Sequence, residues 1–155
     1  MPNLPIPQLT FFADLSVQVD VPIDVGQTVH GIRRVIPIVG GTVQGQGWTA
    51  RVLPGGADFQ LLVNSRLAEL DARYVIETDG GDLIYVQNRA VRTASPEVMS
   101  KLVRSEAVDP QSVYFRCSPS FETSSKALAW TSESLFVGTG ARYPDKVVMR
   151  FFEVT

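Results

Sequence analysis

Alternation of apolar and polar residues runs through most of the chain and predicts β-strands. Between Leu9 and Val21 an apolar residue stands at every second position, which is typical of a strand with one buried face. A loop is expected at 22–31. Similar patterns predict further strands at 31–38, 48–53, 59–64, 71–78, 82–88, 90–94, 112–118, 127–139 and 146–154. The last strand is apolar on both faces except at Arg150, so we expect it to be central or covered by a helix.

Glycine turns and one helix separate these strands. Pro54-Gly55-Gly56 and Asp79-Gly80-Gly81 each predict the turn of a β-hairpin. Ser95 can cap a helix and Pro96 fits its first turn. Apolar residues then recur at four-residue spacing, which gives the helix one apolar face. We therefore predict a helix at about 96–107 that lies across the sheet or closes one end of it.

The succession of strands predicts an all-β fold. The strand–helix–strand rhythm of a parallel sheet is absent, so we predict a closed antiparallel β-barrel of about 8–10 strands with one short helix. A β-sandwich is the alternative. Residues 1–8 are rich in proline and should form an extended N-terminal lead-in. Residues 9–155 are then a single barrel domain of ordinary size.

Composition narrows the classes of function. The formal net charge is −2, so no basic surface for nucleic acid is expected. The single cysteine, Cys117, excludes an internal disulfide. The first residues lack the basic and apolar regions of a signal peptide, and no apolar run reaches the ~20 residues of a membrane helix. These features predict a cytoplasmic protein with no membrane partner.

Common catalytic and metal-binding motifs are absent. The glycine pairs are not followed by the Lys-Ser/Thr of a phosphate loop. One histidine, His30, and one cysteine cannot build the usual zinc sites, and no Gly-x-Ser-x-Gly elbow supplies a serine nucleophile. We therefore expect neither a metal nor a cofactor. An oxygen-only metal site is a less favoured alternative, built from Asp58, Asp71, Asp79 and Asp82.

Polar residues within the predicted strands are the remaining candidates. A charge buried in an apolar wall costs several kcal/mol unless it is paired, so each must meet a partner or a ligand. Arg73 and Glu77 share a strand face about 13 Å apart, which leaves room for a small ligand if that face points inward. We predict catalytic roles for Asp58, Arg73, Tyr85, Arg116 and Glu122, and ligand-binding roles for Arg34, Gln60, Glu77, Tyr114 and Trp130. Alternatively, such groups form an internal network of arginines and carboxylates that fixes the strand register.

Several short blocks follow one another in a characteristic order. They are Gly31-Ile32-Arg33-Arg34, Ile36 to Thr42, Val52 to Gln60, Asp71-Ala72-Arg73-Tyr74, Glu77 to Gly81, Leu83 to Val86, Tyr114-Phe115-Arg116, Phe121-Glu122-Thr123, Ala129-Trp130 and Phe136 to Gly140. From Leu9 to Val154 the chain thereby resembles the family called domain of unknown function 3237, or uncharacterised protein family 0311. It departs at Ala90, where the family usually has glycine, and at Thr131-Ser132-Glu133, where Leu-Asn-Arg is more frequent.

The resemblance implies a closed antiparallel barrel, similar to allene-oxide-cyclase or lipocalin-like barrels. From relatives in natural-product pathways it implies cofactor-free ring closure or isomerisation of phenolic or polyketide compounds. We therefore predict a small-molecule-binding barrel that acts as a cofactor-independent isomerase, cyclase or lyase on a small aromatic, phenolic or polyketide-like compound by acid–base catalysis. Arginines would stabilise an enolate or phenolate. A non-catalytic, calycin-like carrier is the alternative, and a structural role as a homo-oligomer is a third interpretation.

Overall fold

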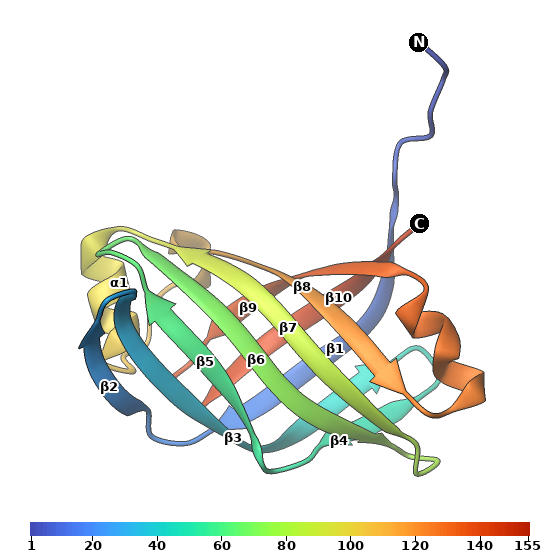
Figure 1. The fold of residues 1–155 in the computed structure, drawn as a ribbon, viewed down its shortest axis with the longest axis horizontal. Coiled ribbons are helices and arrows are strands. Elements are labelled where there is room, and N and C mark those ends of the chain that lie inside the picture. The colour runs from blue at the N-terminus through green and yellow to red at the C-terminus, as the bar shows by residue number, and fades with distance from the viewer.

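The computed structural model describes all 155 residues and consists mainly of antiparallel β-structure. Figure 1 shows an elongated barrel with α1 at one end and a coiled segment, in orange, at the other. The strands are β1 (Leu9–Val19), β2 (Ile23–Thr28), β3 (Gly31–Gly45), β4 (Thr49–Val52), β5 (Gly56–Leu62), β6 (Leu67–Thr78), β7 (Leu83–Thr93), β8 (Tyr114–Thr123), β9 (Leu135–Arg142) and β10 (Lys146–Val154). The helical segments are α1 (Pro96–Val103) and the 3-10 segments η1 (Pro110–Ser112) and η2 (Lys126–Ser132).

These strands close into an eight-position barrel. β1 and β2 follow one another along one side of β3, and β4 and β5 follow one another along its other side. The strands β6 to β10 then pair in sequence order, and β10 pairs with β1 to complete the ring. Apart from the closing pair of β1 and β10, positions that are adjacent in the barrel are therefore also adjacent along the chain. The predicted closed antiparallel barrel is confirmed, and the sandwich alternative is wrong.

The segment Pro54-Gly55-Gly56 interrupts a strand and does not reverse it. β4 and β5 both run antiparallel to β3 and to β6, so the chain keeps its direction across the break. Pro54 has no N–H for the ladder, and Gly55 adopts a φ of +105° that glycine tolerates. The predicted hairpin at this segment is wrong. The reversal lies at Gly45 and Trp48, where the Gly45 amide donates to the Trp48 carbonyl at 2.9 Å.

Other element boundaries also differ from the predictions. β2 occupies most of the expected loop at 22–31, and β3 continues through Gly40 and Gly41 because their backbone pairs with β1. β7 is one strand where two were expected. The 3-10 segment η2 replaces the first half of the strand expected at 127–139, and the Thr131 hydroxyl donates to the Leu128 carbonyl within it at 2.7 Å. Pairing with other strands of the barrel decides the first three cases, and a local hydrogen bond supports the last.

The helix α1 lies at one end of the barrel, as Figure 1 shows. The Ser95 hydroxyl accepts a hydrogen bond from the Val98 amide at 3.2 Å, which caps the helix as expected. Arg34, on β3, donates through Nη2 to the Val103 carbonyl at 3.0 Å and so ties the end of α1 to the barrel rim. The helix ends at Val103 and not near residue 107, because Ser105 adopts a left-handed φ of +58°.

The two chain ends leave the barrel together at the end opposite α1 (Figure 1). Gln8 and Thr155 exchange two backbone hydrogen bonds of 2.7 and 2.8 Å, and residues 1–8 extend away from the barrel.

The last strand, β10, is central, since it pairs with both β1 and β9. Its outer face is not covered by a helix, because Val148 on that face is exposed. None of the helical segments has the length and apolar character of a membrane span.

Candidate active site in the barrel interior

The barrel interior is divided into an aromatic half and a polar half. Near η2 the rings of Phe12, Phe121 and Phe136 pack with centroids 4.9–5.3 Å apart. Trp48 and Trp130 extend this cluster. Tilted and edge-on rings at such distances attract one another and fill space well. The half nearer to α1 holds a cavity.

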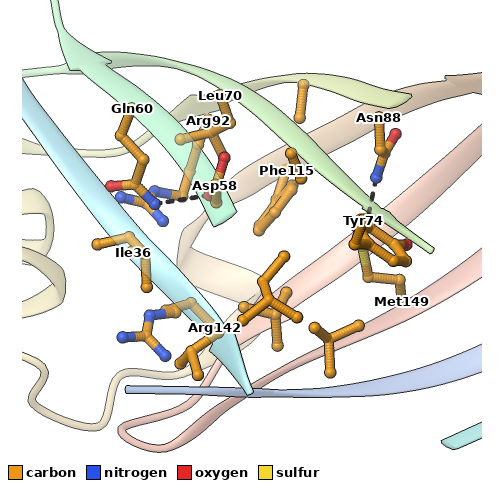
Figure 2. Close-up of a pocket in the computed structure, with 16 residues that line it drawn as sticks. Ile36, Asp58, Gln60, Leu70, Tyr74, Asn88, Arg92, Phe115, Arg142 and Met149 are labelled. Atoms are coloured by element: carbon orange, nitrogen blue, oxygen red, sulfur yellow. Dashed lines mark hydrogen bonds between the residues drawn. The ribbon is translucent and has the colours of Figure 1, made fainter. Parts of the chain in front are cut away.

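The cavity is enclosed by strands from most of the barrel circumference (Figure 2). Its volume is about 40 Å³, counted as the space that the centre of a water molecule can occupy. A single water needs roughly 10–15 Å³ by this measure. Apolar side chains form most of the wall, and six polar side chains also line it: Asp58, Gln60, Tyr74, Asn88, Arg92 and Arg142. An apolar space with a few converging polar groups is the usual form of a small-molecule site.

Asp58 is the only carboxylate that lines the cavity. It lies on β5 opposite Ala72 of β6, and its Oδ2 accepts a hydrogen bond from Gln60 Nε2 at 2.9 Å. Its Oδ1 is buried and has no partner. Burial raises the pKa of this carboxyl, although Gln60 and the positive charges of Arg92 and Arg142 oppose the shift. Such a carboxyl is suited to both take and give a proton.

Two buried arginines face the same cavity. Arg92, on β7, is 2% exposed, and its Nε has no hydrogen-bond partner. Burial lowers the pKa of Arg92 to about 10; the charges of Arg142 and Arg34 act in the same direction, and Asp58 acts against it. Arg142, at the end of β9, donates from Nη1 to two backbone carbonyls around the β9–β10 turn. The cavity end nearest α1 therefore holds more positive than negative groups.

Tyr74 and Asn88 supply polar groups farther from the arginines (Figure 2). Burial raises the pKa of the Tyr74 phenol, and nearby Cys117 and Asp58 add to the shift. The phenol therefore stays protonated and can donate a hydrogen bond. Asn88 Nδ2 lies 3.4 Å from the sulfur of Met149, a weak acceptor. Burial also raises the pKa of the Cys117 thiol, to about 11, so this thiol is not a ready nucleophile.

Polar atoms without a partner are concentrated in this cavity. The chain has five buried side-chain atoms that lack a hydrogen bond, and all five belong to residues that line it. They are Asp58 Oδ1, Gln60 Oε1, Tyr74 Oη, Asn88 Oδ1 and Arg92 Nε. Unsatisfied buried polar atoms are uncommon in folded proteins. Their clustering around one space indicates a site that a polar guest completes.

The structure brings three of the predicted site residues to this end of the barrel. Asp58 and Gln60 line the cavity. Arg34 is buried at the rim, where it forms an ion pair of 2.7 Å with Asp24. Trp130 lies in the aromatic cluster at the other end. The remaining predicted residues are on the outer surface: Arg73, Glu77, Tyr85, Tyr114, Arg116 and Glu122.

The expected convergence of these outer residues with Asp58 is therefore wrong. On β6 the buried positions are Ala68, Leu70, Tyr74 and Ile76, so Arg73 and Glu77 point outward by alternation. Placing the apolar face of a strand inside and its charged face in water avoids the cost of burying charge. The oxygen-only metal site is not formed either, because Asp58 and Asp71 lie on opposite faces, and no three His, Cys, Asp or Glu side chains form a cluster.

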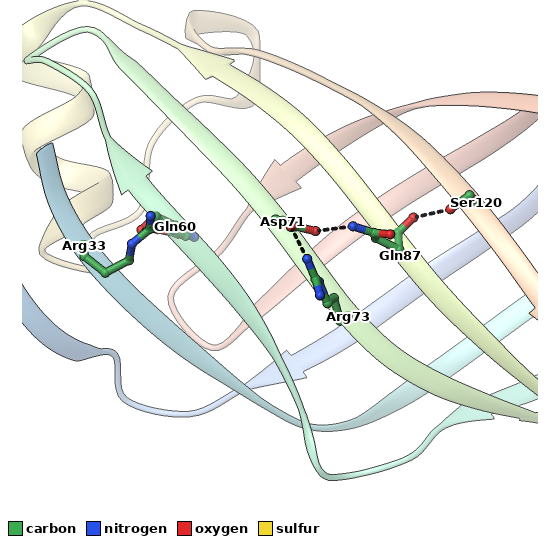
Figure 3. Close-up of polar contacts among 6 residues, drawn as sticks. All are labelled: Arg33, Gln60, Asp71, Arg73, Gln87 and Ser120. Carbon is green, nitrogen blue, oxygen red and sulfur yellow. Dashed lines mark hydrogen bonds and ion pairs between the residues drawn. The ribbon is translucent and has the colours of Figure 1, made fainter. Parts of the chain in front are cut away.

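Arg73 belongs to a polar network on the outer surface that spans three strands (Figure 3). Arg73 Nη2 donates to Asp71 Oδ2 at 3.0 Å, Gln87 Nε2 donates to Asp71 Oδ1 at 3.2 Å, and the Ser120 hydroxyl donates to the Gln87 carbonyl at 3.4 Å. Burial opposes ionisation of Asp71, but the hydrogen bonds from Arg73 and Gln87 prevail and lower its pKa. The network links β6, β7 and β8 on the outside of the barrel, not in the interior where such a network was expected.

Four cavity residues are absent from the prediction: Tyr74, Asn88, Arg92 and Arg142. Alternation identifies two of them, because Asn88 and Arg92 share the face of the buried Ile84 and Val86. The expected break between residues 88 and 90 hid this pattern. Tyr74 shares the more apolar face of its strand, which is the face that points inward. No local signal marks Arg142, which lies beyond the expected end of its strand.

A sequence profile described as Protein of unknown function (DUF3237) matches residues 7–154. The chain belongs to this family. The match spans almost the whole chain and confirms the resemblance seen in the sequence blocks. A UPF0311 protein of Rhodopseudomonas palustris is 46% identical over 129 residues, which are 83% of this chain and 84% of the relative.

Solved structures share the fold of this DUF3237 protein. A crystal structure of a conserved protein of unknown function from Rhodopseudomonas palustris has a TM-score of 0.92 and 38% identity, covering 98% of this chain and 100% of the other. A crystal structure of an enzyme from Penicillium herquei has a TM-score of 0.73 and 18% identity, covering all of both chains. At that identity the likeness shows the shared barrel alone.

Proposed function

We propose that this protein binds a small organic compound in the cavity and catalyses a cofactor-independent isomerisation, cyclisation or elimination on it. The five unpartnered polar atoms around the cavity carry the proposal. A buried polar atom left without any partner costs about 1–3 kcal/mol, so these atoms favour water or a polar guest in the cavity. A guest that supplies hydrogen-bond partners would recover part of this cost on binding, so binding energy is available at the place where the chemistry would occur.

Asp58 is the proposed proton carrier. Its carboxylate would take a proton from a carbon next to a carbonyl; the C–H bond breaks, an O–H bond forms on Asp58, and the electron pair moves to the carbonyl oxygen as an enolate. The positive charges of Arg92 and Arg142 would favour the enolate, and the Tyr74 hydroxyl would donate a hydrogen bond to it. In a substrate with a C=C bond next to that carbon, the electron pair extends to the γ-carbon; return of the proton to the γ-carbon moves the double bond and completes an isomerisation without an oxidant or a reductant.

These assignments transfer the predicted roles to the inner face of the barrel. The oxyanion-stabilising role expected for Arg73 or Arg116 falls to Arg92 and Arg142, and the role expected for Tyr85 falls to Tyr74. A small aromatic, phenolic or polyketide-like substrate follows from the family resemblance and suits the largely apolar wall, and its binding requires that side chains of the wall move outward to enlarge the cavity of about 40 Å³. The Penicillium herquei neighbour shows that a barrel of this fold can be an enzyme.

Deuterium exchange tests the proposal directly. A panel of small phenols and 1,3-dicarbonyl compounds is incubated with the protein in D₂O, and exchange at carbon is followed by proton NMR. We expect exchange with the wild type that slows at least ~100-fold in Asp58→Asn, since general acid–base catalysis contributes about 10²–10⁴-fold. The control is Asp71→Asn, the same change on the outer surface, which should leave exchange unchanged.

Three results would contradict parts of the proposal. Exchange that persists in Asp58→Asn would remove this residue from the mechanism. Saturable binding in saturation-transfer NMR without exchange would favour the ligand-carrying barrel. If no compound binds and none exchanges, the cavity is not a ligand site for this class and the proposal fails.

A further inference from the structure

The end of the cavity nearest α1 encloses more positive than negative charge. Two guanidinium groups, those of Arg92 and Arg142, line the cavity with one carboxylate, Asp58. The third buried arginine, Arg34, is already paired with a carboxylate at the rim. Asp145 acts on Arg142 from an exposed turn, where water screens its charge. With Asp58 ionised, the enclosed groups carry a surplus of one positive charge.

Arg92 forms no ion pair or side-chain hydrogen bond, and the nearby charge of Asp58 compensates it only in part. None of the five ion pairs of the chain includes Arg92 or Arg142, and the buried Nε of Arg92 makes no hydrogen bond. A buried charge without a close partner is destabilising, and an apolar side chain of similar volume is often more favourable there. Asp58, the one carboxylate of the cavity, is shared between Arg92 and Arg142, so it offsets the cost of burying two guanidinium groups only in part. An anion in the cavity would provide the missing partner.

The surrounding groups favour one class of anion. The planar guanidinium fork matches the two oxygens of a carboxylate. A surplus of one charge is neutralised by a monoanion, whereas a phosphate would bring a second negative charge, and no lysine lines the cavity to balance it. Most of the remaining wall is apolar and includes Phe115, Val147 and Met149, which suits a hydrocarbon body.

We propose that the cavity binds a small organic monocarboxylate, with its carboxylate between Arg92 and Arg142 and its hydrocarbon part against Phe115 and Met149. This inference rests on the proposed function and specifies its substrate class. The cavity of about 40 Å³ holds about three water-sized groups, so an acid as long as butyrate, with four carbons and two oxygens, enters only when side chains of the wall move outward. The carboxylate then takes up the charge of Arg92 and Arg142, so the Tyr74 hydroxyl is the group that remains to stabilise an enolate oxygen, and Asp58 remains free for the neighbouring carbon.

A matched pair of ligands tests the inference. Binding of sodium butyrate and of butyramide, which has the same shape and no charge, is measured by isothermal titration calorimetry and saturation-transfer NMR. Benzoate and benzamide extend the comparison to a ring. We expect each acid to bind at least about tenfold more tightly than its amide, because a hydrogen bond to a charged group is worth about tenfold or more in affinity.

Arg92→Met removes the proposed anchor and keeps much of the side-chain volume. It should weaken butyrate binding at least about tenfold while butyramide binding stays unchanged. Without ligand, its Tm should equal or exceed that of the wild type, because an unpartnered buried charge has been removed. The control is Arg89→Met, the same change on the exposed face of the same strand. Arg142→Gln is a second variant that removes an anchor, and circular dichroism shows whether it is folded.

The outcomes separate this inference from the function on which it rests. Acids and amides that bind equally well would overturn the monocarboxylate inference and leave the proposed proton-transfer function standing. Failure of every compound to bind would overturn both. A lower Tm of Arg92→Met with unchanged butyrate binding would show that Arg92 has a structural role, and this would also overturn the inference.

Discussion

Asp58 and Arg92 are held inside the barrel although each is more stable in water as an ion. Burial raises the pKa of the carboxyl and lowers that of the guanidinium to about 10, and both shifts arise because a poorly solvated site disfavours the charged form. Gln60 compensates one oxygen of Asp58, whereas the other oxygen has no partner. The interior thus retains polar groups at a cost in stability, which is frequent at functional sites.

The pH dependence of stability should reveal the raised pKa of Asp58. Between the unfolded pKa of 3.8 and the higher folded pKa, the folded protein holds a proton that the unfolded chain has lost. The contribution of Asp58 to the free energy of unfolding therefore falls as the pH rises through this window. Above the folded pKa this contribution no longer changes with pH. Asp58→Asn cannot titrate, so we expect it to gain stability relative to the wild type as the pH rises from 4 to 8. Urea unfolding at several pH values measures this difference.

Asp71→Asn is the control, because its expected effect on the pH dependence of stability has the opposite sign. The folded pKa of Asp71 is lowered by its hydrogen bonds, so its contribution is present above the unfolded pKa and is lost as the pH falls through the folded pKa. The Asn variant should therefore be less stable than the wild type at neutral pH and should approach it in acid. The same sign for both variants would contradict the burial of Asp58.

At individual positions, the sequence predicts which residues are polar but not which face of a strand points inward. Asp58 and Gln60 were identified because they follow a recognisable glycine motif. The prediction for Arg73 is wrong because the neighbouring Tyr74 and Ile76, and not the charged face, mark the buried side of the strand. Arg142 could not be found locally, since its inward position depends on how far β9 extends against β10.

The long strand formed by β4 and β5 is the element that positions the site. Its break at Pro54-Gly55-Gly56 lets β4 and β5 both pair with β3 and with β6. Asp58 and Gln60 follow the break at once and share one face of β5. The position of Gly56 also sets the distance to β6, because a Cβ there would lie 2.5 Å from the Arg73 carbonyl oxygen and 2.6 Å from the Tyr74 Cβ.

Gly56→Ala should therefore destabilise the fold by about 1–3 kcal/mol, the usual cost of overpacking. The added methyl group can be accommodated only if β5 and β6 separate, which would also displace Asp58 and Tyr74. Urea unfolding measures the change in free energy. The control is Gly80→Ala in the β6–β7 turn, where the nearest atom to a new Cβ lies 3.9 Å away, and its effect should stay within about 0.5 kcal/mol. Equal effects would argue against close packing at Gly56.

Elements with strong local patterns could be predicted, whereas those that depend on distant pairing could not. The alternation in β1 and the cap of α1 at Ser95 are local signals, and both elements form where expected. β3 passes through Gly40 and Gly41 because strand β1 supplies hydrogen bonds along it. The Pro54-Gly55-Gly56 segment has the composition of a hairpin turn, but its strands have other partners. Turn composition alone cannot distinguish a reversal from an interruption.

On the scale of the whole molecule, the aromatic cluster that stabilises the fold and the polar residues of the candidate site lie at opposite ends of the barrel. The aromatic cluster fills the end near η2, and none of its rings lines the cavity. The unpartnered polar atoms all lie around the cavity. Apolar packing at one end can therefore offset the cost of polar groups at the other, because both belong to one closed sheet and unfold together.

This separation predicts that Phe136→Ala weakens the fold but not the site. Phe136 is 1% exposed and its ring centroid lies 4.9 Å from those of Phe12 and Phe121, so its loss should cost about 3–5 kcal/mol in urea unfolding. The adjacent Leu135 is 76% exposed, and Leu135→Ala should change stability by no more than about 0.5 kcal/mol. Butyrate affinity, measured where each variant is folded, should be unchanged in both. A loss of butyrate binding in folded Phe136→Ala would show that the two ends are coupled, and the cavity would then depend on packing through the full length of the barrel.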